Sequence, residues 1–465
     1  GYTVPQKTLD EAWKTVLLNH FHDILPGSSI HRVYEEAEAA FAGVIRTAEQ
    51  ICREAAGQIT GRPGGYTVFN SLSWQRTALL PLPQGASTSA PSQVIDGKTY
   101  VEVTVPPCGW APLQPNNDAS STLKAAPDRL ENDLICVRFN QKGEITSIFD
   151  KETGKELAAG LCNSLKMYKD IPILWDAWDI DSMYELTPVE LDEPAQIEVV
   201  SVGPLAAVLH LTRRINQSTL RQEIVLRRGS RRVDFRTTVD WQESHKMLKV
   251  NFPVNFHANE AIHEIQFGHI RRPTHRSRKY DADRFEVPAH KWTCLAEENG
   301  GFAVLNDCKY GVGVDGNSIN LTLLKSAMGP DMTADKGEQI FTYAFYAWNG
   351  SFNDCDLVRE GYDLNVPVVL IPGTAEQYSL FSLDAANIIL DTVKPAEDGS
   401  GDIVLRLYEA KRAATSCTLH TTLPVKSVLV TNMLEEPQGT LEVKGGDIPL
   451  KFRAFEVKTI RLKLS

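Results

Sequence analysis

Several protein classes are excluded by what the sequence lacks. No segment approaches the roughly 20 apolar residues that a membrane-spanning helix needs. Residues 1–9 show no basic segment followed by an apolar run, so we expect neither a membrane partner nor a signal peptide. The net charge of −11 argues against nucleic acid as a partner. The eight cysteines include no CxxC pair, which argues against a disulfide framework or a structural zinc site. We therefore expect mostly buried free thiols and a cytoplasmic protein.

Two helical patterns lie near the start of the chain. Thr8 and Glu11 have the spacing of a capping box, which predicts a helix start at Thr8. Apolar residues then recur at helical intervals as far as Phe21. Pro26-Gly27 is expected to end this helix, and a second helix is expected from about His31. Two amphipathic helices make an incomplete bundle, so their apolar faces need cover from a missing helix or from the β units behind them.

After Gly65 the pattern changes to short β-branched segments bounded by turn residues. Two of the longer expected strands are Lys249–Phe256 and Lys451–Leu464. The residues alone therefore predict a short helical segment followed by three β units, each an antiparallel sandwich. One turn between strands is rich in arginine and is expected to be solvated; its arginines are Arg227, Arg228, Arg231 and Arg232.

The segment with a chemical signal is Leu17–Ile30, in which His22 and Asp23 are adjacent. A neutral imidazole is a good zinc ligand, and an adjacent carboxylate can accept hydrogen bonds from a sugar. The spacing alone favours a structural interpretation, in which His22 caps the first helix and Asp23 begins the turn. His20 would lie on a different helix face from His22, so the two cannot be a simple pair of ligands.

Strings of residues spread over the whole chain resemble glycoside hydrolase family 38 α-mannosidases. The first, Ala12-Trp13-Lys14 with Leu17–Ile30, resembles the start of the family's middle helical domain. The others follow in the family's order and are Val68–Trp74, Gly143–Lys151, Trp175–Asp181, Arg272–Arg276, Arg284–Pro288 and Leu305–Gly311. Several of them are similar in particular to the branch that contains many bacterial enzymes and the cytosolic eukaryotic ones.

The resemblance implies a fold and a set of domains. We expect a mainly β protein with a partial three-helix bundle at residues 1–60 and a small β-sandwich at residues 61–118. A large supersandwich of the galactose-mutarotase type is expected at residues 119–393, and a C-terminal β unit at residues 394–465. The family's N-terminal α/β domain, which supplies the nucleophile, the acid/base residue and the other zinc ligands, is not part of this chain.

The resemblance also implies a chemistry. Family members use a retaining mechanism, in which zinc binds the mannose 2- and 3-hydroxyls and an aspartate nucleophile forms a glycosyl-enzyme intermediate. On this chain, His22 would be a zinc ligand and Asp23 a carboxylate that contacts the substrate. His20 replaces the glutamine that is usual at its position in the family, and we do not expect it to be a ligand.

A second candidate region pairs aromatic rings with carboxylates, as sugar-binding sites do. Its residues are Trp175, Asp176, Trp178 and Asp179, which we expect to contact the substrate and to lie on the side of the β region that faces His22. A tryptophan pair packed in a β core, with solvated acids, would show the same pattern.

Arg272 is a further candidate substrate contact, in a basic loop with Arg271 and His275. This loop is expected to be solvated, or else to contact the missing domain or the substrate. The expected activity of the parent protein is hydrolysis of terminal α-linked mannose from oligosaccharides. This chain alone should be inactive and hold no ordered zinc at His22, because the other ligands of that site belong to the missing domain.

Two alternatives stay open. One is a carbohydrate-binding or architectural β protein without a catalytic domain, and the other is a different retaining glycosidase with a related β region. Members of the family often form homo-oligomers, although no segment of this sequence indicates an interface.

Overall fold

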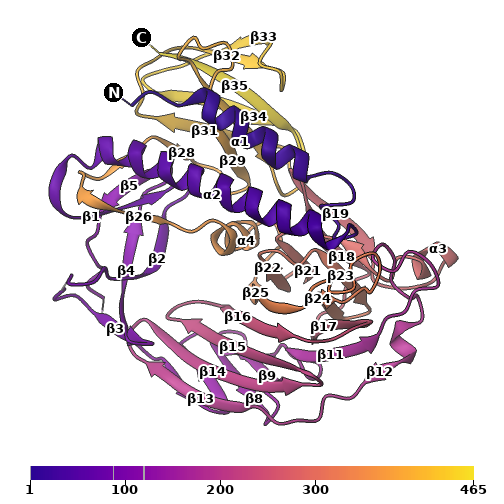
Figure 1. Ribbon diagram of the computed structural model, residues 1–465. Coiled ribbons are helices and arrows are strands. Elements are labelled where there is room, and N and C mark those ends of the chain that lie inside the picture. Colours follow the sequence, from indigo (N-terminus) through magenta and orange to yellow (C-terminus); the bar gives the residue numbers. More distant parts are fainter. Residues whose placement is uncertain (1, 87, 119–120, 465) are drawn as a thin grey trace.

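The computed structural model describes residues 2–86, 88–118 and 121–464. In these ranges, two long helices precede a small β-sandwich, a supersandwich and a C-terminal β unit (Figure 1). The expected mainly β fold with an N-terminal helical segment is confirmed. Within the same ranges, no helix is both long and apolar enough to cross a membrane.

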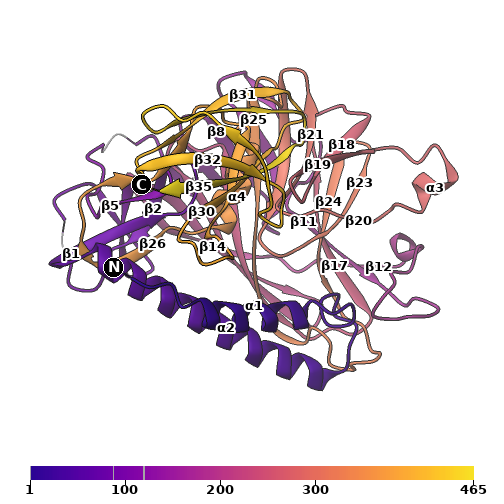
Figure 2. The same cartoon turned by 90° about the horizontal axis from the view of Figure 1, so that it is seen from above.

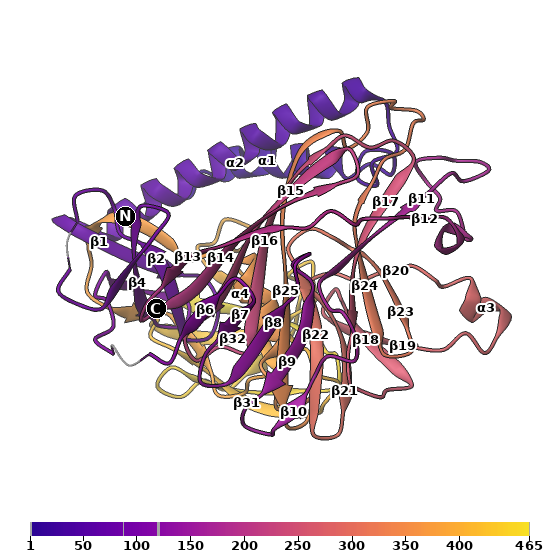
Figure 3. The ribbon, with the colours of Figure 1, turned by 90° about the horizontal axis from the view of Figure 1, so that it is seen from below.

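The helical segment consists of α1 (Gln6–Asn19) and α2 (His31–Ile59), which lie side by side along one side of the β units (Figures 2 and 3). α1 begins ahead of the expected Thr8. Pro5 occupies its N-cap without a side-chain cap hydrogen bond, so Thr8 lies inside the helix instead of at its cap. α2 begins at His31, as expected.

The C-terminal end of α2 docks on the small β-sandwich. The hydroxyl of Thr60, the C-cap residue, donates a hydrogen bond to the Pro372 carbonyl oxygen (3.1 Å). Gly373 permits this approach, because a Cβ atom at that position would lie 2.5 Å from the Thr60 carbonyl oxygen. Its φ of +97° also favours glycine.

The small β-sandwich packs a four-stranded sheet against a three-stranded one around Val68, Val101, Val103 and Val105. The four-stranded sheet has the order β26 (Val369–Thr374), β1 (Arg62–Asn70), β5 (Gly109–Pro112) and β27 (Tyr378–Ser379). The three-stranded sheet has the order β2 (Arg76–Pro81), β4 (Lys98–Val105) and β3 (Ser92–Ile95). Because β26 and β27 pair with β1 and β5, this unit uses residues well beyond the expected 61–118. The expected boundary after residue 118 adjoins residues outside the described ranges.

The supersandwich places a nine-stranded sheet over two smaller sheets, with the main core between them. The nine strands follow the order β13 (Gln196–Val202), β14 (Ala206–Ile215), β15 (Ser218–Arg227), β16 (Arg232–Trp241), β25 (Gly337–Asn349), β22 (Gly300–Asn306), β21 (Trp292–Glu297), β18 (Glu260–Ile265) and β19 (Gly268–Pro273). The first smaller sheet has the order β10 (Lys155–Glu156), β9 (Ile145–Asp150), β8 (Ile135–Phe139), β7 (Arg129–Glu131) and β6 (Lys124–Ala126). The second has the order β12 (Pro188–Val189), β11 (Ser164–Lys169), β17 (Lys246–Pro253), β24 (Ser318–Lys325), β23 (Gly311–Asp315) and β20 (Val287–Pro288). β17 ends at Pro253 instead of the expected Phe256, and the Val254 N–H still donates a hydrogen bond to the Asn317 carbonyl oxygen (2.9 Å).

The face of the nine-stranded sheet that points away from the main core is called the outer face below. It is covered in two places. α4 (Leu357–Asn365) and the C-terminal unit cover one part, around Trp348. At the other, Ile95 of the small sandwich packs on Val208 and Val225.

The C-terminal unit is a second sandwich with its own core. One sheet has the order β28 (Phe381–Leu383), β31 (Thr415–Thr421) and β34 (Asp447–Phe452). The other has the order β29 (Ile388–Pro395), β30 (Ile403–Glu409), β35 (Val457–Leu464), β32 (Val425–Thr431) and β33 (Pro437–Leu441). The expected domain boundary at residue 394 falls inside β29. The segment Lys451–Leu464 forms two strands instead of one, because a turn closed by Glu456 N–H and the Arg453 carbonyl (3.1 Å) interrupts it.

Candidate active site

His22 and Asp23 lie in a turn, not on helix α1. The helix ends at Asn19, whose buried side chain donates a hydrogen bond to the Thr15 carbonyl (2.9 Å), a local bond that competes with further helix. His20 then occupies the C-cap position. The interpretation of His22 as the helix cap is therefore wrong, and so is the expectation that the helix continues to Pro26-Gly27.

Tyr34 of α2 holds this turn in place. Its hydroxyl donates a hydrogen bond to the Asp23 carbonyl oxygen (3.1 Å) and accepts one from the Ser29 N–H (2.6 Å). The side chain of His22 is 68% exposed and that of Asp23 is 43% exposed, and His22 Nε2 lies 3.5 Å from Asp23 Oδ2. Two exposed side chains thus project from a fixed backbone. The expectation that His22 lies near the surface at the edge of the helical segment is confirmed.

The second candidate region forms a loop between β11 and the short 3₁₀ helix η1 (Tyr184–Leu186). We call residues 175–181 the tryptophan loop. The N–H groups of Trp178 and Asp179 both donate to the Trp175 carbonyl oxygen (2.7 and 2.9 Å), which gives the loop a tight turn. The ring centroid of Trp178 lies 6.3 Å from that of His22. The expectation that this loop faces His22 is confirmed, and Trp175 and Trp178, which are 72% and 53% exposed, are not a packed core pair.

Asp176 anchors the tryptophan loop to the rest of the protein. Its Oδ2 accepts hydrogen bonds from the N–H groups of Met328 (2.6 Å) and Gly329 (3.1 Å) and lies 3.0 Å from His245 Nε2. Burial opposes ionisation of this carboxyl, but these hydrogen bonds outweigh it and hold the pKa of Asp176 below its ordinary value. Its other oxygen, Oδ1, is buried without a hydrogen-bond partner among the described residues. One oxygen of Asp176 therefore joins the tryptophan loop to the loop that contains Met328 and Gly329.

The loop that contains Met328 and Gly329 also contacts helix α2. Oδ2 of Asp331, a buried residue, lies 3.2 Å from Nδ1 of His31 at the start of α2. The Thr333 hydroxyl donates a hydrogen bond to Asp331 Oδ1 (2.7 Å) and also lies 3.2 Å from His31 Nδ1. The sequence reasoning missed Tyr34, His245 and Asp331. The partners of His245 and Asp331 are distant in the chain, and no local pattern marks the bonds of Tyr34 to Asp23 and Ser29.

Asp179 lies at the exposed edge of the tryptophan loop. Its Oδ1 accepts a hydrogen bond from the Ile180 N–H (2.9 Å), a bond within the loop itself. The rest of this carboxylate faces solvent, so Asp179 is available to a ligand in a way that Asp176 Oδ2 is not.

Arg272 lies elsewhere, on β19 at a cavity of about 20 Å³ next to α3 (Lys279–Ala282). Burial and the nearby Arg284 lower the pKa of this guanidinium. Among the described residues, no hydrogen bond, ion pair or ring contact joins Arg272 to His22, Asp23 or the tryptophan loop. The structure therefore brings His22, Asp23 and the tryptophan loop together but does not add Arg272 to them.

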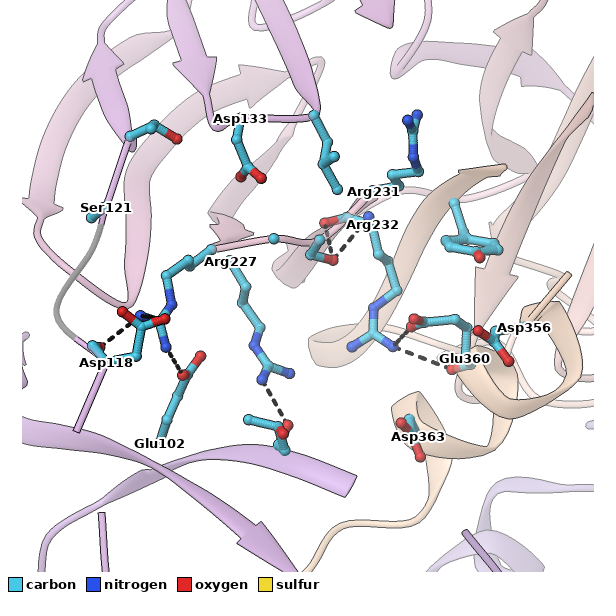
Figure 4. Close-up of a pocket in the computed structure, with 17 residues that line it drawn as sticks. Glu102, Asp118, Ser121, Asp133, Arg227, Arg231, Arg232, Asp356, Glu360 and Asp363 are labelled. Atoms are coloured by element: carbon cyan, nitrogen blue, oxygen red, sulfur yellow. Dashed lines mark hydrogen bonds and ion pairs between the residues drawn. The ribbon is translucent and has the colours of Figure 1, made fainter. Parts of the chain in front are cut away.

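A cavity of about 690 Å³ lies away from this cluster, between the small sandwich, the supersandwich and α4 (Figure 4). The arginine turn expected to be solvated projects into it. Arg232 lies 2.6 Å from Glu360 of α4, and Arg228 pairs with Glu102 of the small sandwich. That expectation is wrong, because neighbouring units enclose the turn and pair its charges. None of the candidate site residues lines this cavity, so we interpret it as part of the interface between the small sandwich, the supersandwich and α4.

His22 and Asp23 together offer one imidazole nitrogen and one carboxylate to a metal ion. A zinc site in a protein needs at least three protein ligands. Within the ranges that the structure describes, no third His, Cys, Asp or Glu side chain joins this pair. The His22-Asp23 pair therefore offers at most two protein ligands to a metal ion.

Three family models match the chain in order. The alpha mannosidase middle domain matches residues 1–59, the glycosyl hydrolases family 38 C-terminal domain matches residues 130–333, and the family 38 C-terminal beta sandwich domain matches residues 387–460. An α-mannosidase of known structure from Enterococcus faecalis has the same fold, with a TM-score of 0.80 at 18% identity over 99% of this chain and 64% of that one.

Relatives of known sequence are similar along the entire chain. Alpha-mannosidase 2C1 of Homo sapiens is 36% identical over 490 residues, which cover 100% of this chain and 46% of that protein. Alpha-mannosidase G of Dictyostelium discoideum is 32% identical, over 99% of this chain and 48% of that protein. The chain thus spans about half the length of the curated relatives it matches. Since its helical segment, supersandwich and C-terminal unit each match a part of the same family, the chain belongs to glycosyl hydrolase family 38.

Proposed function

We propose that this chain is the C-terminal portion of a zinc-dependent, retaining α-mannosidase that releases terminal α-linked mannose from oligosaccharides. Family membership supports this proposal, as do relatives that are named α-mannosidases. The observation that carries it is the exposed His22-Asp23 pair beside the exposed ring of Trp178, at a centroid distance of 6.3 Å. A purely architectural β protein has no use for such an arrangement on a rigid turn.

In this proposal the tryptophan loop is part of the wall of the sugar site. Trp175 and Trp178 offer aromatic faces to the C–H face of a sugar ring. Asp23 and Asp179, which are exposed at its edge, offer carboxylates to hydroxyl groups. Asp176 has a different role from the one expected, because Oδ2 is already engaged. We assign it as a positioning residue that sets Trp178 beside His22.

His22 is proposed as one zinc ligand of the complete protein. The imidazole fits that role because it is exposed, fixed in position by the turn and adjacent to a carboxylate. Zinc there would polarise and orient a bound sugar hydroxyl. The remaining ligands, the nucleophile and the acid/base residue are proposed to come from the part of the protein that this chain does not include. Arg272 would reach the substrate only from outside the His22 cluster.

The same surface is proposed as the docking site for that missing half. Trp13, Leu17 and Leu18 of α1 are 64%, 63% and 70% exposed. Beside the tryptophan loop, Ile173 and Leu174 are 98% and 67% exposed. Adjacent exposed apolar side chains on this scale mark an interaction surface. Roughly half of each curated relative lies outside the matched region, so a large domain is available to cover them.

The eight cysteines are all free, which supports a cytoplasmic location.

The test uses the complete protein, from which this chain is taken. Zinc content and hydrolysis of an aryl α-mannoside are measured for the wild type, for His22→Ala and for the matched control His20→Ala. His20 is also exposed and lies in the same turn, but we assign it no ligand role. His22→Ala should lower zinc content and activity together, while His20→Ala leaves both near the wild-type level.

Two outcomes would contradict the proposal in different ways. If His22→Ala keeps stoichiometric zinc and loses only activity, His22 is a substrate contact instead of a ligand. If the complete wild-type protein binds mannosides but never hydrolyses them, the enzyme assignment itself is wrong and a binding function replaces it.

A further inference from the structure

A second group of metal-ligating side chains lies far from His22 in the fold, where the small sandwich meets the outer face of the nine-stranded sheet. His210 Nε2 lies 3.1 Å from Asp96 Oδ2 and 3.8 Å from Glu223 Oε2. The ligand atoms of all three residues lie within 4.8 Å of one another. In the described ranges, this is the one place where three such side chains converge.

Two of these side chains come from neighbouring strands. His210 on β14 and Glu223 on β15 are direct partners in the sheet register, so both side chains project from the same face. Alternate residues of the same two strands, such as Leu209 and Ile224, are buried in the main core, which places His210 and Glu223 on the outer face. The backbone of a central sheet therefore fixes their separation.

The third side chain comes from the small sandwich and is equally constrained. Asp96-Gly97 forms the two-residue turn between β3 and β4, with φ of +47° and +73°, as a type I′ turn requires. Its neighbour Ile95 is buried against Val208 and Val225. Gln93 of the same strand bonds both to the Ala206 carbonyl (2.7 Å) and to the Ala206 N–H (2.9 Å). The turn thus holds the Asp96 carboxylate over the sheet without help from a ligand.

The separations suit a metal ion. Zinc–ligand bonds of about 2.0–2.2 Å place tetrahedral ligands about 3.3–3.6 Å apart, and the distances of 3.1 and 3.8 Å from His210 Nε2 lie on either side of that range. One imidazole and two carboxylates are ligand types that zinc accepts. Arg236 donates to Oε1 of Glu223, which orients the carboxylate and leaves Oε2 turned toward His210. Arg221 and Arg236 both line the neighbouring cavity and balance the two carboxylates, so the case for a divalent cation rests on the ligand types and their separations.

We propose that Asp96, His210 and Glu223 bind a zinc ion that joins the small sandwich to the supersandwich. A cavity of about 450 Å³ lies beside His210 and Glu223, which line it together with Arg221 and Arg236. A surface ion pair between Asp96 and His210, with Glu223 held beside it by Arg236, is the simpler alternative, and the zinc titration below separates the two. This proposal does not depend on the proposed function, since the two sites share no residue.

The test removes the first candidate site before it examines the second. The purified chain of 465 residues that carries His22→Ala is titrated with zinc by isothermal calorimetry. We expect one zinc ion per chain. Addition of His210→Ala or Glu223→Gln should weaken this binding by about 100-fold or more, because loss of even an outer partner of a ligand costs about 10–100-fold. Cobalt in place of zinc should give the intense visible bands of a tetrahedral site, and the same variants should abolish them.

His420→Ala is the matched control. His420 Nδ1 lies 2.7 Å from Asp447 Oδ1 at similar exposure, and among the described residues this pair has no third ligand. Its replacement should leave zinc binding unchanged. Circular dichroism checks that every variant is folded, and zinc should raise the melting temperature of the His22→Ala chain but not that of the chain with His210→Ala added. The proposal is overturned if the His22→Ala chain binds no stoichiometric zinc, or if folded His210→Ala variants bind it as tightly.

Discussion

Replacement of Asp176 by asparagine tests the anchor of the tryptophan loop most directly. An amide nitrogen cannot accept the bonds from Met328 and Gly329. If the amide oxygen takes them instead, the NH₂ group must occupy the buried position of Oδ1, which has no acceptor among the described residues. A hydrogen bond to a charged group contributes about 1.5–3 kcal/mol, and a buried group left unpaired costs about 1–3 kcal/mol. We expect Asp176→Asn to weaken this anchor by about 2–3 kcal/mol.

Hydrogen exchange measured by mass spectrometry reports this loss locally. A change of about 2–3 kcal/mol corresponds to about 30- to 150-fold faster exchange of the Met328 and Gly329 amides. Asp179→Asn is the matched control, since this residue lies in the same loop but is exposed and bonds only to Ile180. It should change exchange at these amides very little. Unchanged exchange at Met328 and Gly329 in Asp176→Asn would refute the anchoring argument.

The pH dependence of the same exchange has a definite sign. Because the pKa of Asp176 lies below its ordinary value of 3.8, the ionised carboxyl stabilises the folded loop. A contribution of this kind is fully present above the pKa of the unfolded chain and is lost as the pH falls through the lower folded pKa. Protection of Met328 and Gly329 should therefore be constant from pH 7 to about pH 5 and should decline only below about pH 4. A loss between pH 7 and pH 5 would mean that another group sets it.

Three further predictions concern activity, docking and stability. The chain alone should not hydrolyse an aryl α-mannoside, because no nucleophile is assigned to it, and turnover well above the blank would contradict that assignment. Leu17→Glu should weaken association with a separately expressed N-terminal half by more than tenfold (about 1.4 kcal/mol) in a binding assay. Lys14 is an exposed polar residue on the same helix, so Lys14→Gln should leave this association unchanged. Phe235→Ala should destabilise the supersandwich by about 3–5 kcal/mol in urea unfolding, because this fully buried ring stacks on Tyr343 at 5.0 Å. A loss below about 1 kcal/mol would show that the cavity collapses.

Much of the fold could be predicted from local pattern. The 3.6-residue periodicity located α2 from His31 onward, and short β-branched segments located some of the strands in each of the three β units. Domain boundaries were harder, because β26 at Val369–Thr374 returns to pair with β1 in the small sandwich. A strand reads alike whichever sheet it joins, so only tertiary pairing reveals that return. The prediction that the arginine turn is solvated was wrong for the same reason, because its carboxylate partners, Glu102 and Glu360, lie on other parts of the fold.

For the candidate site too, the sequence identified residues but not their long-range contacts. His22, Asp23 and the tryptophan loop were found because the strings around them resemble a family, and their juxtaposition follows from the fold. Asp176 was identified as a residue of interest, but its role was not, because the sequence gives no sign that its partners are the distant amides of Met328 and Gly329.

The contacts of Tyr34, Asp331, Asp176 and Trp178 link the segments around the candidate site in a closed ring. The turn that bears His22 is tied to α2 through Tyr34, and α2 is tied through His31 to Asp331. The loop that contains Asp331 also supplies the amides that hold Asp176, and the tryptophan loop returns to His22 through Trp178. Apart from the bond of Tyr34 to Asp23, which spans 11 residues, each link joins segments that are distant in sequence, so no single segment positions His22 against Trp178. A substitution at any link should therefore change the geometry of the pair while leaving the β cores, which share none of these residues, folded.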